Sequence, residues 1–206
     1  CVAVFDFDGT LTRCDTLPRF ILFACGSWRF CAGFLLFSPL LVLMRLRLYP
    51  NWRAKQRLFA FFFRGMDYGR FAGLGSRFAD VVERFRRKEV TDLMQQYVAS
   101  GAAVYVISAS IEEWVRPWCE QEGVKDVLCT KVEVGGDGRL TGRLNTPNCY
   151  GQEKVNRLLE VEPRRQSYIL HVYGDSRGDR ELIAFADKGC YVDRAMRAGT
   201  CPHDLH

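Results

Sequence analysis

Two aspartates directly follow a short apolar stretch near the start of the chain. The stretch is Val2–Phe5, and Asp6 and Asp8 come next in the sequence VAVFDFDGTLT. Side chains two positions apart in a strand point to the same side, so both carboxylates should project together from the strand end. Like charges held this close repel each other unless they share a proton or bind a cation. An ordinary acidic turn would use the same residues, so this stretch alone leaves both interpretations open.

Two later stretches with the composition of strands also end in polar residues. Ala102–Ile107 leads into Ser108, and Ser167–Tyr173 leads into the sequence GDSRGD, which contains Asp175 and Asp179. The carboxyl ends of parallel strands meet at one edge of a sheet, where ligands bind. Carboxylate oxygens at that edge are hard ligands, which suit Mg²⁺ far better than a soft metal. The three strand ends therefore predict one acidic site.

A serine and a lysine complete the set of residues that phosphoryl transfer needs. Ser108 offers a hydroxyl, and the N–H groups after it are expected to begin a helix that can hold an anion. Lys154 offers a point positive charge. Acids around a cation, with a hydroxyl and an ammonium, can position and neutralise a phosphoryl group.

Each of these residues also has a purely structural interpretation. Ser108, Asp175 and Asp179 could cap helices, and Lys154 could be a solvated lysine in the first turn of a helix. We favour phosphoryl transfer because four independent structural explanations would otherwise have to hold at once.

The order of apolar stretches predicts an α/β fold with a central parallel sheet, because strands alternate with helices. About 90 residues separate the first strand from the next, which is too many for one crossover helix. A glycine-rich segment over 65–75 is expected to join helices within that insertion. The other predicted elements are strands at 102–107, 127–128, 167–173 and 189–192, a hairpin over 131–144, and helices over 78–100, 111–122, 151–159 and 181–186.

Four stretches resemble, in order, the motifs of haloacid dehalogenase-type phosphatases. They are DFDGT at Asp6–Thr10, Ser108 after a strand, Lys154 in GQEKV, and GDSRGD at Gly174–Asp179. The resemblance covers most of the chain outside the insertion. It implies a Rossmann-like core with a central parallel sheet, formed by residues 1–15 and 88–206. It also implies a helical cap over 16–87, of the type found in the phosphoserine phosphatase-like group.

The resemblance implies a role for each motif residue. Asp6 would be the nucleophile that forms an aspartyl-phosphate, and Asp8 would protonate the leaving group and then activate water. Carbon–halogen cleavage is not expected, because the dehalogenases lack an acid at the position of Asp8. The residues implied to hold the phosphate are Thr10, Ser108, Ala109 and Lys154. Those implied to bind Mg²⁺ are Asp6, the backbone carbonyl of Asp8, and Asp175, with Asp179 orienting the metal shell.

The insertion begins with a long apolar segment, Phe20–Met44, followed by a basic and aromatic one. Its uncharged part, Phe30–Met44, is shorter than the roughly 20 residues that span a bilayer, and Pro39 is expected to kink a helix there. Arginines mixed with aromatic residues over 45–64 are typical of a surface that lies on anionic lipid. We therefore favour peripheral membrane contact over a buried cap helix, and over a membrane span.

The insertion also bears on the substrate. Asp15 falls where soluble phosphoserine phosphatases place a glutamate that reads the substrate amine, and Arg64 and Arg70 are candidates for reading a carboxylate. The apolar and then basic cap is similar to that of the C-type phosphatidylglycerophosphatases, which remove a terminal phosphate from a lipid head group. The alternatives are a soluble phosphatase for a small metabolite, such as phosphoserine or histidinol phosphate, and a catalytically silent binding protein. A soluble phosphatase would bury the side chains of residues 30–44.

Composition gives weaker constraints. The net charge of +5 favours an anionic partner, but we expect no nucleic acid partner. The nine cysteines are scattered, odd in number and without a CxxC pair, which favours reduced thiols in the cytosol. With three histidines and no paired cysteines, a zinc site is not expected. No signal peptide precedes the first strand, so we expect a cytoplasmic protein that contacts the cytoplasmic face of the membrane through its cap.

Overall fold

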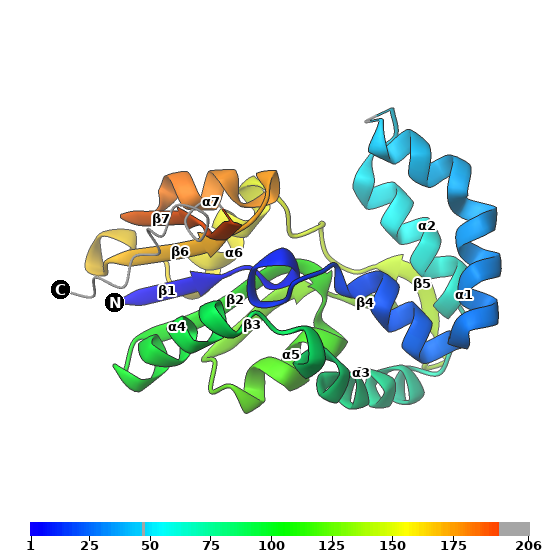
Figure 1. Cartoon of the computed structure of the whole chain (residues 1–206), viewed down its shortest axis with the longest axis horizontal. Helices are drawn as coiled ribbons and strands as arrows, with labels where there is room; N and C mark the ends of the chain where they lie inside the picture. The colour runs from blue at the N-terminus through cyan, green and yellow to red at the C-terminus, as the bar shows by residue number, and fades with distance from the viewer. Residues whose placement is uncertain (47, 194–206) are drawn as a thin grey trace.

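A sheet of five parallel strands forms the centre of the molecule, in the order β3-β2-β1-β6-β7. The structure is a computed structural model that describes residues 1–46 and 48–193. Figure 1 shows helices on both faces of the sheet, which confirms the predicted α/β fold. The strands are β1 (Val2–Phe5), β2 (Ala103–Ile111), β3 (Asp126–Thr130), β6 (Leu170–Gly174) and β7 (Lys188–Tyr191).

Strand β1 lies in the middle of the sheet and is buried on both faces, as its unbroken apolar sequence predicts. Ala3 and Phe5 pack on one side, against α4 (Lys88–Ala99) and α5 (Glu112–Gln121). Val2 and Val4 pack on the other side, against α6 (Gln152–Val161) and α7 (Arg180–Phe185). Burial on both sides fixes the position of the strand end, and therefore of the two aspartates that follow it.

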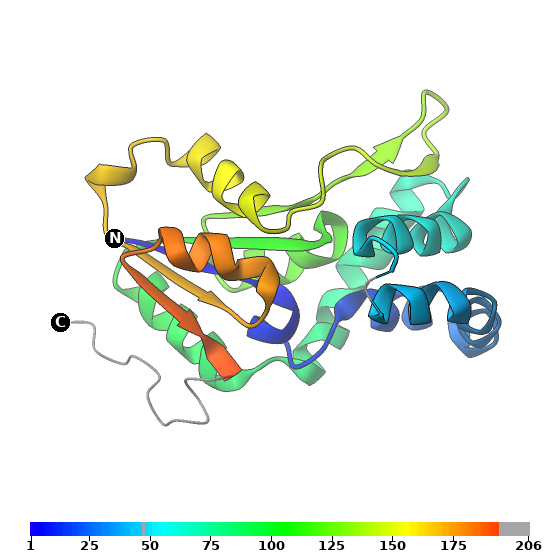
Figure 2. The ribbon, with the colours of Figure 1, turned by 90° about the horizontal axis from the view of Figure 1, so that it is seen from above.

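Three helices beyond the carboxyl ends of the strands make up what we call the cap helices. They are α1 (Thr16–Arg45), α2 (Asn51–Phe63) and α3 (Tyr68–Val82). The predicted hairpin is present as β4 (Val132–Val134) and β5 (Leu140–Leu144). It extends from the core to α2, as Figure 2 shows. The hairpin thus packs against the cap helices although it belongs to the later part of the sequence.

A cluster of aromatic rings joins the cap helices to the core. Phe20 of α1 is fully buried and stacks on Trp114 of α5 with ring centroids 4.4 Å apart. The rings of Phe63, Phe71 and Phe78 surround it at 5.3–5.5 Å. Ring contacts of this kind add about 0.5–1.5 kcal/mol per pair to the free energy of burial. This cluster therefore fixes the start of α1 over the strand ends.

The predicted linker over 65–75 is wrong, because α3 begins at Tyr68. The carboxylate of Asp67 caps that helix by accepting a hydrogen bond from the backbone N–H of Arg70 at 2.9 Å. Gly75 allows α3 to approach α5 closely, since a Cβ atom there would lie 2.0 Å from the carbonyl oxygen of Glu113. Gly75 therefore serves helix packing, whereas the sequence pattern suggested a break.

Two other helix predictions also need correction. The single helix expected over 78–100 is divided, because α3 ends at Val82 and α4 begins only at Lys88. Between them the chain returns to the core, where the backbone N–H of Arg87 donates to the carbonyl of Leu11 at 2.7 Å. Helix α1 continues through Pro39, and its backbone departs from helical geometry at Gly26 instead. Gly26 has a φ of +79°, a conformation that glycine adopts without strain.

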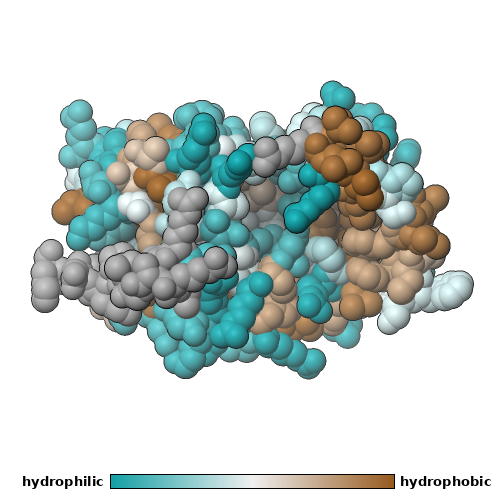
Figure 3. Space-filling model, turned by 45° about the horizontal axis from the view of Figure 1, so that its top comes forward, coloured by the Kyte–Doolittle hydropathy of each residue, from teal (hydrophilic) through white to brown (hydrophobic). Residues whose placement is uncertain are grey.

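The outer half of α1 carries large apolar side chains on its surface. Leu35 is 77% exposed and Leu36 is 65% exposed, whereas Phe30, Phe34 and Phe37 pack inward. The helix is long and apolar enough to cross a membrane by length and composition, and only 17% of its most apolar 18-residue stretch is buried. Figure 3 shows the apolar surface gathered at the cap end of the molecule. Full burial of residues 30–44, expected for a soluble phosphatase, is therefore not observed.

The cysteines lie scattered through the fold. Among the described residues eight cysteines have free thiols, three of them buried: Cys119, Cys129 and Cys149. Cys201, His203 and His206 lie outside the described residues.

We expect Phe20→Ala to destabilise the fold strongly, because it removes the ring at the centre of the aromatic cluster. The free energy of unfolding, measured by urea denaturation, should fall by about 3–5 kcal/mol. Leu35→Ala is the matched control, since its side chain is exposed on the same helix, and it should change the free energy by less than about 0.5 kcal/mol. Equal effects of the two substitutions would show that the aromatic cluster does not join the cap helices to the core.

Candidate active site

Seven of the predicted site residues line one cavity of about 400 Å³ between the strand ends and the cap helices: Asp6, Asp8, Asp15, Ser108, Ala109, Lys154 and Asp175. Thr10 and Asp179 are not among its lining residues. The core supplies Asp6 and Asp8 after β1, and α2 of the cap supplies Asn51 and Lys55. The other lining residues are Gly9, Arg13, Cys14, Asp15, Arg87, Ser108, Ala109, Tyr150, Lys154, Asp175, Ser176, Gly178 and Asp193. The structure therefore brings together three strand ends that lie far apart in the sequence.

A buried lysine joins two of the aspartates. The Nζ atom of Lys154 lies 2.8 Å from Asp6 and 2.5 Å from Asp179, and its side chain is almost completely buried. Burial alone would lower the pKa of Lys154, but the two carboxylates raise it, so the ammonium stays charged. Burial also raises the pKa of Asp6, against the lowering effect of Lys154. A solvated first-turn lysine, the structural alternative, is excluded by this burial.

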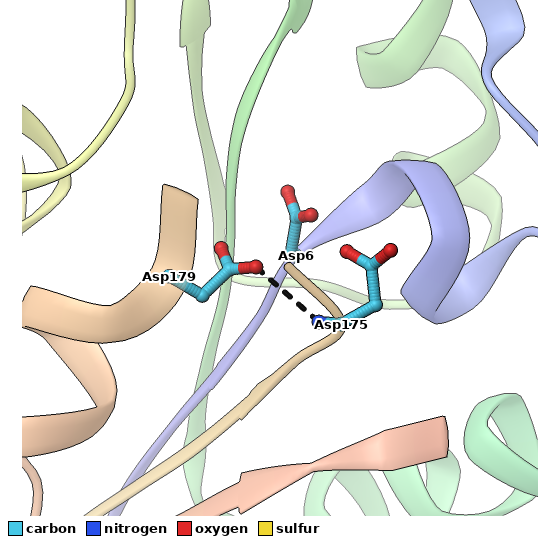
Figure 4. Close-up of side chains that lie close together, drawn as sticks. All are labelled: Asp6, Asp175 and Asp179. Carbon is cyan, nitrogen blue, oxygen red and sulfur yellow. Dashed lines mark hydrogen bonds between the residues drawn. The ribbon is translucent and has the colours of Figure 1, made fainter. Parts of the chain in front are cut away.

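Asp179 positions the loop that presents Asp175. Its Oδ2 atom accepts hydrogen bonds from the backbone N–H groups of Asp175 at 3.2 Å and Ser176 at 3.1 Å, and its Oδ1 atom accepts from Lys154. Figure 4 shows the bond to Asp175 and the three carboxylates of Asp6, Asp175 and Asp179 around one space. Asp179 also forms a capping box with Ser176, so the structural interpretation as a cap holds for this residue as well.

The residues present fit a hard divalent cation. One oxygen from each of Asp6, Asp175 and Asp179 lies within 4.8 Å of the others. Burial, and next the charges of Asp6 and Asp179, raise the pKa of Asp175 to about 7. Because both oxygens of Asp179 already accept hydrogen bonds, Asp6 and Asp175 are better placed as ligands. Gly9 makes room for this arrangement, since a Cβ atom there would lie 2.2 Å from Asp175 Oδ2.

The carboxylate of Asp8 has a separate environment. It accepts hydrogen bonds from the backbone N–H and hydroxyl of Thr16, at 3.0 and 2.7 Å, and from the hydroxyl of Ser110. Burial, and next the charge of Asp15, raise the pKa of Asp8 to about 6. The sequence interpretation missed Thr16 and Ser110, although each lies close to a motif that it singled out. The side chain of Asp8 is thus held by these two hydroxyls, outside the group of three carboxylates.

Ser108 and Ala109 also line the cavity. The helix predicted over 111–122 is present as α5, which begins at Glu112. Ser108 itself lies inside β2, so the N–H groups directly after it do not begin that helix, and the capping interpretation of Ser108 is wrong. The Ser108 hydroxyl accepts a hydrogen bond from the N–H of Ser110 at 3.2 Å. Thr10 is fully buried, and among the described residues its hydroxyl has no hydrogen-bond partner.

The cap side of the cavity differs from the sequence prediction. Asp15 lines the cavity and also caps α1, by accepting a hydrogen bond from the N–H of Leu17 at 3.0 Å. Arg64 and Arg70 are both exposed and line other parts of the surface, so the structure does not bring them to the cavity.

Helix α2 supplies a positively charged side chain to the cavity instead. Lys55 reaches across to donate a hydrogen bond to the carbonyl of Ala109 at 3.2 Å. Nothing in its sequence context distinguished Lys55 from the other basic residues of the segment.

A second positively charged side chain that the sequence interpretation missed lies where the chain returns from the cap helices to the core. The Nη2 atom of Arg87 donates to the carbonyl of Gly9 at 2.8 Å, and its Nη1 atom pairs with Asp193 at 2.5 Å. Arg87 therefore connects the loop after β1 to the end of the sheet, and it also lines the cavity.

Comparison with known proteins places this geometry in a family. Residues 3–184 match the family model described as haloacid dehalogenase-like hydrolase. Protein CicA of Caulobacter vibrioides is 30% identical over 194 residues, which covers 92% of this chain and 85% of that protein. A histidinol-phosphatase of Neisseria meningitidis is 33% identical over 107 residues, which covers 49% of this chain and 48% of that protein.

Solved structures share the fold. A protein of unknown function from Bordetella pertussis Tohama I superposes with a TM-score of 0.78 at 19% identity, covering 96% of this chain and 95% of that one. A substrate-bound phosphoserine phosphatase superposes with a TM-score of 0.64 at 14% identity, covering 90% and 82% of the two chains. At 14–19% sequence identity, these superpositions show a shared fold only.

We expect Mg²⁺ to stabilise the protein more at about pH 8 than at about pH 5. The folded-state pKa values of Asp175, about 7, and Asp8, about 6, lie above the ordinary value of 3.8. The metal-free folded protein therefore binds more protons than the unfolded chain between these values, and its stability falls as pH rises through this window. Burial causes most of this loss, and for Asp175 the repulsion from Asp6 and Asp179 adds to it. A cation held by Asp6 and Asp175 would stabilise the ionised form of Asp175 against both effects.

The measurement is the thermal midpoint with Mg²⁺ minus the thermal midpoint with EDTA, taken at each pH. Titrating groups outside the site affect both midpoints equally, so their effect cancels in the difference. It should grow by several degrees with pH, at about 2–4 °C for each kcal/mol. Asp175→Asn should abolish most of the growth. A difference that stays constant with pH would contradict the account of the acidic cluster.

Proposed function

We propose that this chain, which belongs to the haloacid dehalogenase-like hydrolases, hydrolyses phosphate monoesters through a covalent aspartyl-phosphate on Asp6. Membership of this family, with phosphatases among the relatives, confirms the predicted enzyme class. One observation carries the proposal: the buried ammonium of Lys154 lies 2.8 Å from the Asp6 carboxylate, at the floor of the cavity. A nucleophilic carboxylate needs this neutralisation when it meets an anionic phosphate.

The first half-reaction transfers the phosphoryl group to Asp6. An oxygen of Asp6 attacks phosphorus in line with the departing ester oxygen, and a bond to phosphorus forms as the ester bond breaks. Lys154 and the hydroxyl of Ser108 stabilise the phosphoryl oxygens, together with the N–H groups of the backbone around Ala109. Asp8 gives its proton to the departing oxygen, which leaves as an alcohol.

The second half-reaction returns Asp6 to its starting state. Asp8, now ionised, takes a proton from water as the water oxygen attacks the phosphorus, and the bond between phosphorus and Asp6 breaks. Inorganic phosphate leaves and the Asp6 carboxylate is restored. A pKa of about 6 suits both roles, because it lies near neutral pH. The hydrogen bonds from Thr16 and Ser110 hold the Asp8 carboxylate in place between the two steps.

The acidic cluster is proposed as a Mg²⁺ site. The ion would be held by Asp6, the backbone carbonyl of Asp8, and Asp175, and when bound it supplies positive charge that offsets the charge of the phosphoryl group. Asp179 keeps Asp175 in position through the hydrogen bond to its backbone N–H.

We further propose residues 1–15 and 88–206 as the catalytic core and 16–87 as the cap insertion. Within the cap, α2 contributes Lys55 to the cavity, where its ammonium can meet a second anionic group of the substrate. Arg64 and Arg70 lie away from the cavity, so neither is in place to read an amino-acid carboxylate. These features favour a substrate with a second phosphate over phosphoserine.

The proposed substrate is a phosphorylated lipid head group, of which phosphatidylglycerophosphate is the model. The observation in its favour is the exposed apolar surface on the outer half of α1, which includes Leu35, Leu36 and Val42. The same helix begins beside the cavity, directly after Asp15. Soluble proteins rarely expose an apolar surface of this kind to water, whereas a cap that rests on a bilayer would bury it in lipid. The enzyme would then act at the cytoplasmic face of the membrane, as a peripheral protein.

A soluble phosphatase for a small metabolite is the second candidate. It is supported by the Neisseria histidinol-phosphatase, which matches about half of the chain. Asp15 also favours it, because its carboxylate lines the cavity and could pair with a substrate amine. A catalytically silent binding protein has the least support, since Asp6, Asp8, Ser108, Lys154 and Asp175 all line the cavity.

We expect Asp6→Asn to abolish hydrolysis of p-nitrophenyl phosphate, because the neutral amide is a poor nucleophile. Asp8→Asn should lower the steady-state rate by about 10²–10⁴-fold, since it removes the group that activates water. Because p-nitrophenolate leaves without a proton, Asp8→Asn should still show a first-turnover burst. Asp15→Asn is the control in the same cavity and should keep most of the activity. Full activity of Asp6→Asn would refute the nucleophile assignment.

We expect the enzyme to hydrolyse phosphatidylglycerophosphate in vesicles faster than phosphoserine or histidinol phosphate, in each case only with Mg²⁺. The double change Leu35→Ser with Leu36→Ser should slow lipid hydrolysis by about tenfold or more, because it removes buried apolar area from the membrane contact. Hydrolysis of p-nitrophenyl phosphate should not change.

The matched control is Val161→Ser with Ile169→Ser, which alters two exposed apolar residues of the core. This pair should leave both reactions unchanged. Preference for a soluble phosphomonoester, with no effect of the α1 pair, would favour the second candidate instead.

A further inference from the structure

A second hollow lies on the cap, between α2 and the hairpin, and takes no part in the chemistry described above. This groove has a volume of about 650 Å³. Arg57 and Arg64 line it from α2, and Arg139 and Arg143 line it from the hairpin. None of these arginines lines the catalytic cavity. We call this hollow the arginine groove.

The charges of the arginine groove are unbalanced. Its two acids are occupied within the hairpin, where Glu133 accepts from the hydroxyl of Thr141 at 2.5 Å and Asp137 accepts from a backbone N–H at 3.1 Å. Within residues 1–46 and 48–193, no carboxylate lies within ion-pair distance of Arg57, Arg64 or Arg143. Three exposed guanidinium groups thus line one groove without an acidic partner, although Arg57 also lies over the ring of Tyr49. The groove therefore carries excess positive charge, which favours an anion.

The walls of the groove are fixed to each other. The backbone N–H of Gly65 donates to the carbonyl of Leu140 at 2.8 Å, and the N–H of Leu140 donates to Met66 at 2.9 Å. Arg139 strengthens this connection through a hydrogen bond from its Nη1 atom to the carbonyl of Gly65 at 2.8 Å. Because the two walls are already joined, an anion can bind without a rearrangement of the backbone.

The groove adjoins the apolar surface of the cap. Phe61 follows Arg57 by one helical turn, is about half exposed, and packs on Phe37 of α1 with ring centroids 5.3 Å apart. Trp52 is also exposed near the start of α2, where Arg53 lies over its ring at 5.1 Å. Arginines and aromatic rings alternating beside exposed leucines match the charge and polarity of the boundary between head groups and acyl chains.

We propose that the arginine groove binds the phosphate group of an anionic phospholipid and thereby orients the cap on the bilayer. The fork geometry of arginine suits phosphate oxygens, which two guanidinium groups from opposite walls can hold together. The lipid bound here is not the substrate but a neighbouring bilayer lipid, whose phosphodiester is not cleaved. The inference rests on the proposed membrane-surface function and adds a second lipid site to it.

The test compares vesicle binding by the full chain and by the triple variant Arg57→Gln, Arg64→Gln, Arg143→Gln. The vesicles contain one part phosphatidylglycerol to two parts phosphatidylcholine, and pure phosphatidylcholine vesicles serve as the neutral comparison. We expect the unaltered chain to prefer the anionic vesicles and the triple variant to lose about tenfold or more of that binding, given roughly 1 kcal/mol for each basic residue near such a surface.

The matched control is Arg84→Gln, Arg164→Gln, Arg180→Gln, which removes the same charge from exposed positions outside the groove. This control should change vesicle binding by less than about twofold. If loss of net charge alone weakened binding, the control would lose as much binding as the triple variant. Both variants should hydrolyse p-nitrophenyl phosphate at the normal rate. This assay keeps a failure of the groove separate from a failure of the proposed phosphatase.

Three results would overturn the inference. The triple variant could bind the anionic vesicles as well as the unaltered chain does, or the control could lose as much binding as the triple variant. Alternatively, millimolar glycerophosphate in solution could release the protein from the vesicles, which would show a site for soluble anions.

Discussion

The ion cluster of Lys154 with Asp6 and Asp179 is the constraint on which the rest of the structure depends. Two carboxylates and an ammonium can stay charged in a buried place only because each is neutralised or hydrogen-bonded by the others. The cluster ties the end of β1 to α6 and to the loop after β6, three segments distant in sequence. It also leaves an excess of negative charge once Asp175 is counted, which is why the site fits a divalent cation.

The proposed separation of roles between Asp6 and Asp8 rests on what holds each carboxylate. Asp6 faces Lys154 and the acidic cluster, whereas Asp8 is held by hydroxyls at the start of α1 and at the end of β2. The cap is thus connected to the chemistry directly, because α1 begins at a residue that binds Asp8. The same helix continues outward into the exposed apolar surface, so one element links the position of Asp8, the proposed proton donor, to the surface that would meet lipid.

The core could be predicted from the sequence because its signals are local. An apolar strand followed by acids, a serine after a strand, and a lysine in a helix each identify one part of the site, and the parallel sheet brings them together. The cap was predicted less well. Gly75 in α3 permits close packing against α5, and the apolar periodicity continues across the break at Arg87, so neither feature marked the true helix boundaries. Lys55 was missed because only the packing of α2 decides which basic residue reaches the cavity.

The proposed mechanism requires that Asp6 carries the phosphoryl group during turnover. Acid quenching during turnover of a phosphate ester, followed by reduction with labelled borohydride, converts an acyl phosphate into a labelled alcohol at the residue that bore it. Peptide sequencing then locates the label. We expect label at Asp6 alone, and a larger labelled fraction of protein for Asp8→Asn than for the unaltered chain. No label, or label at Asp175 or any other residue, would contradict it.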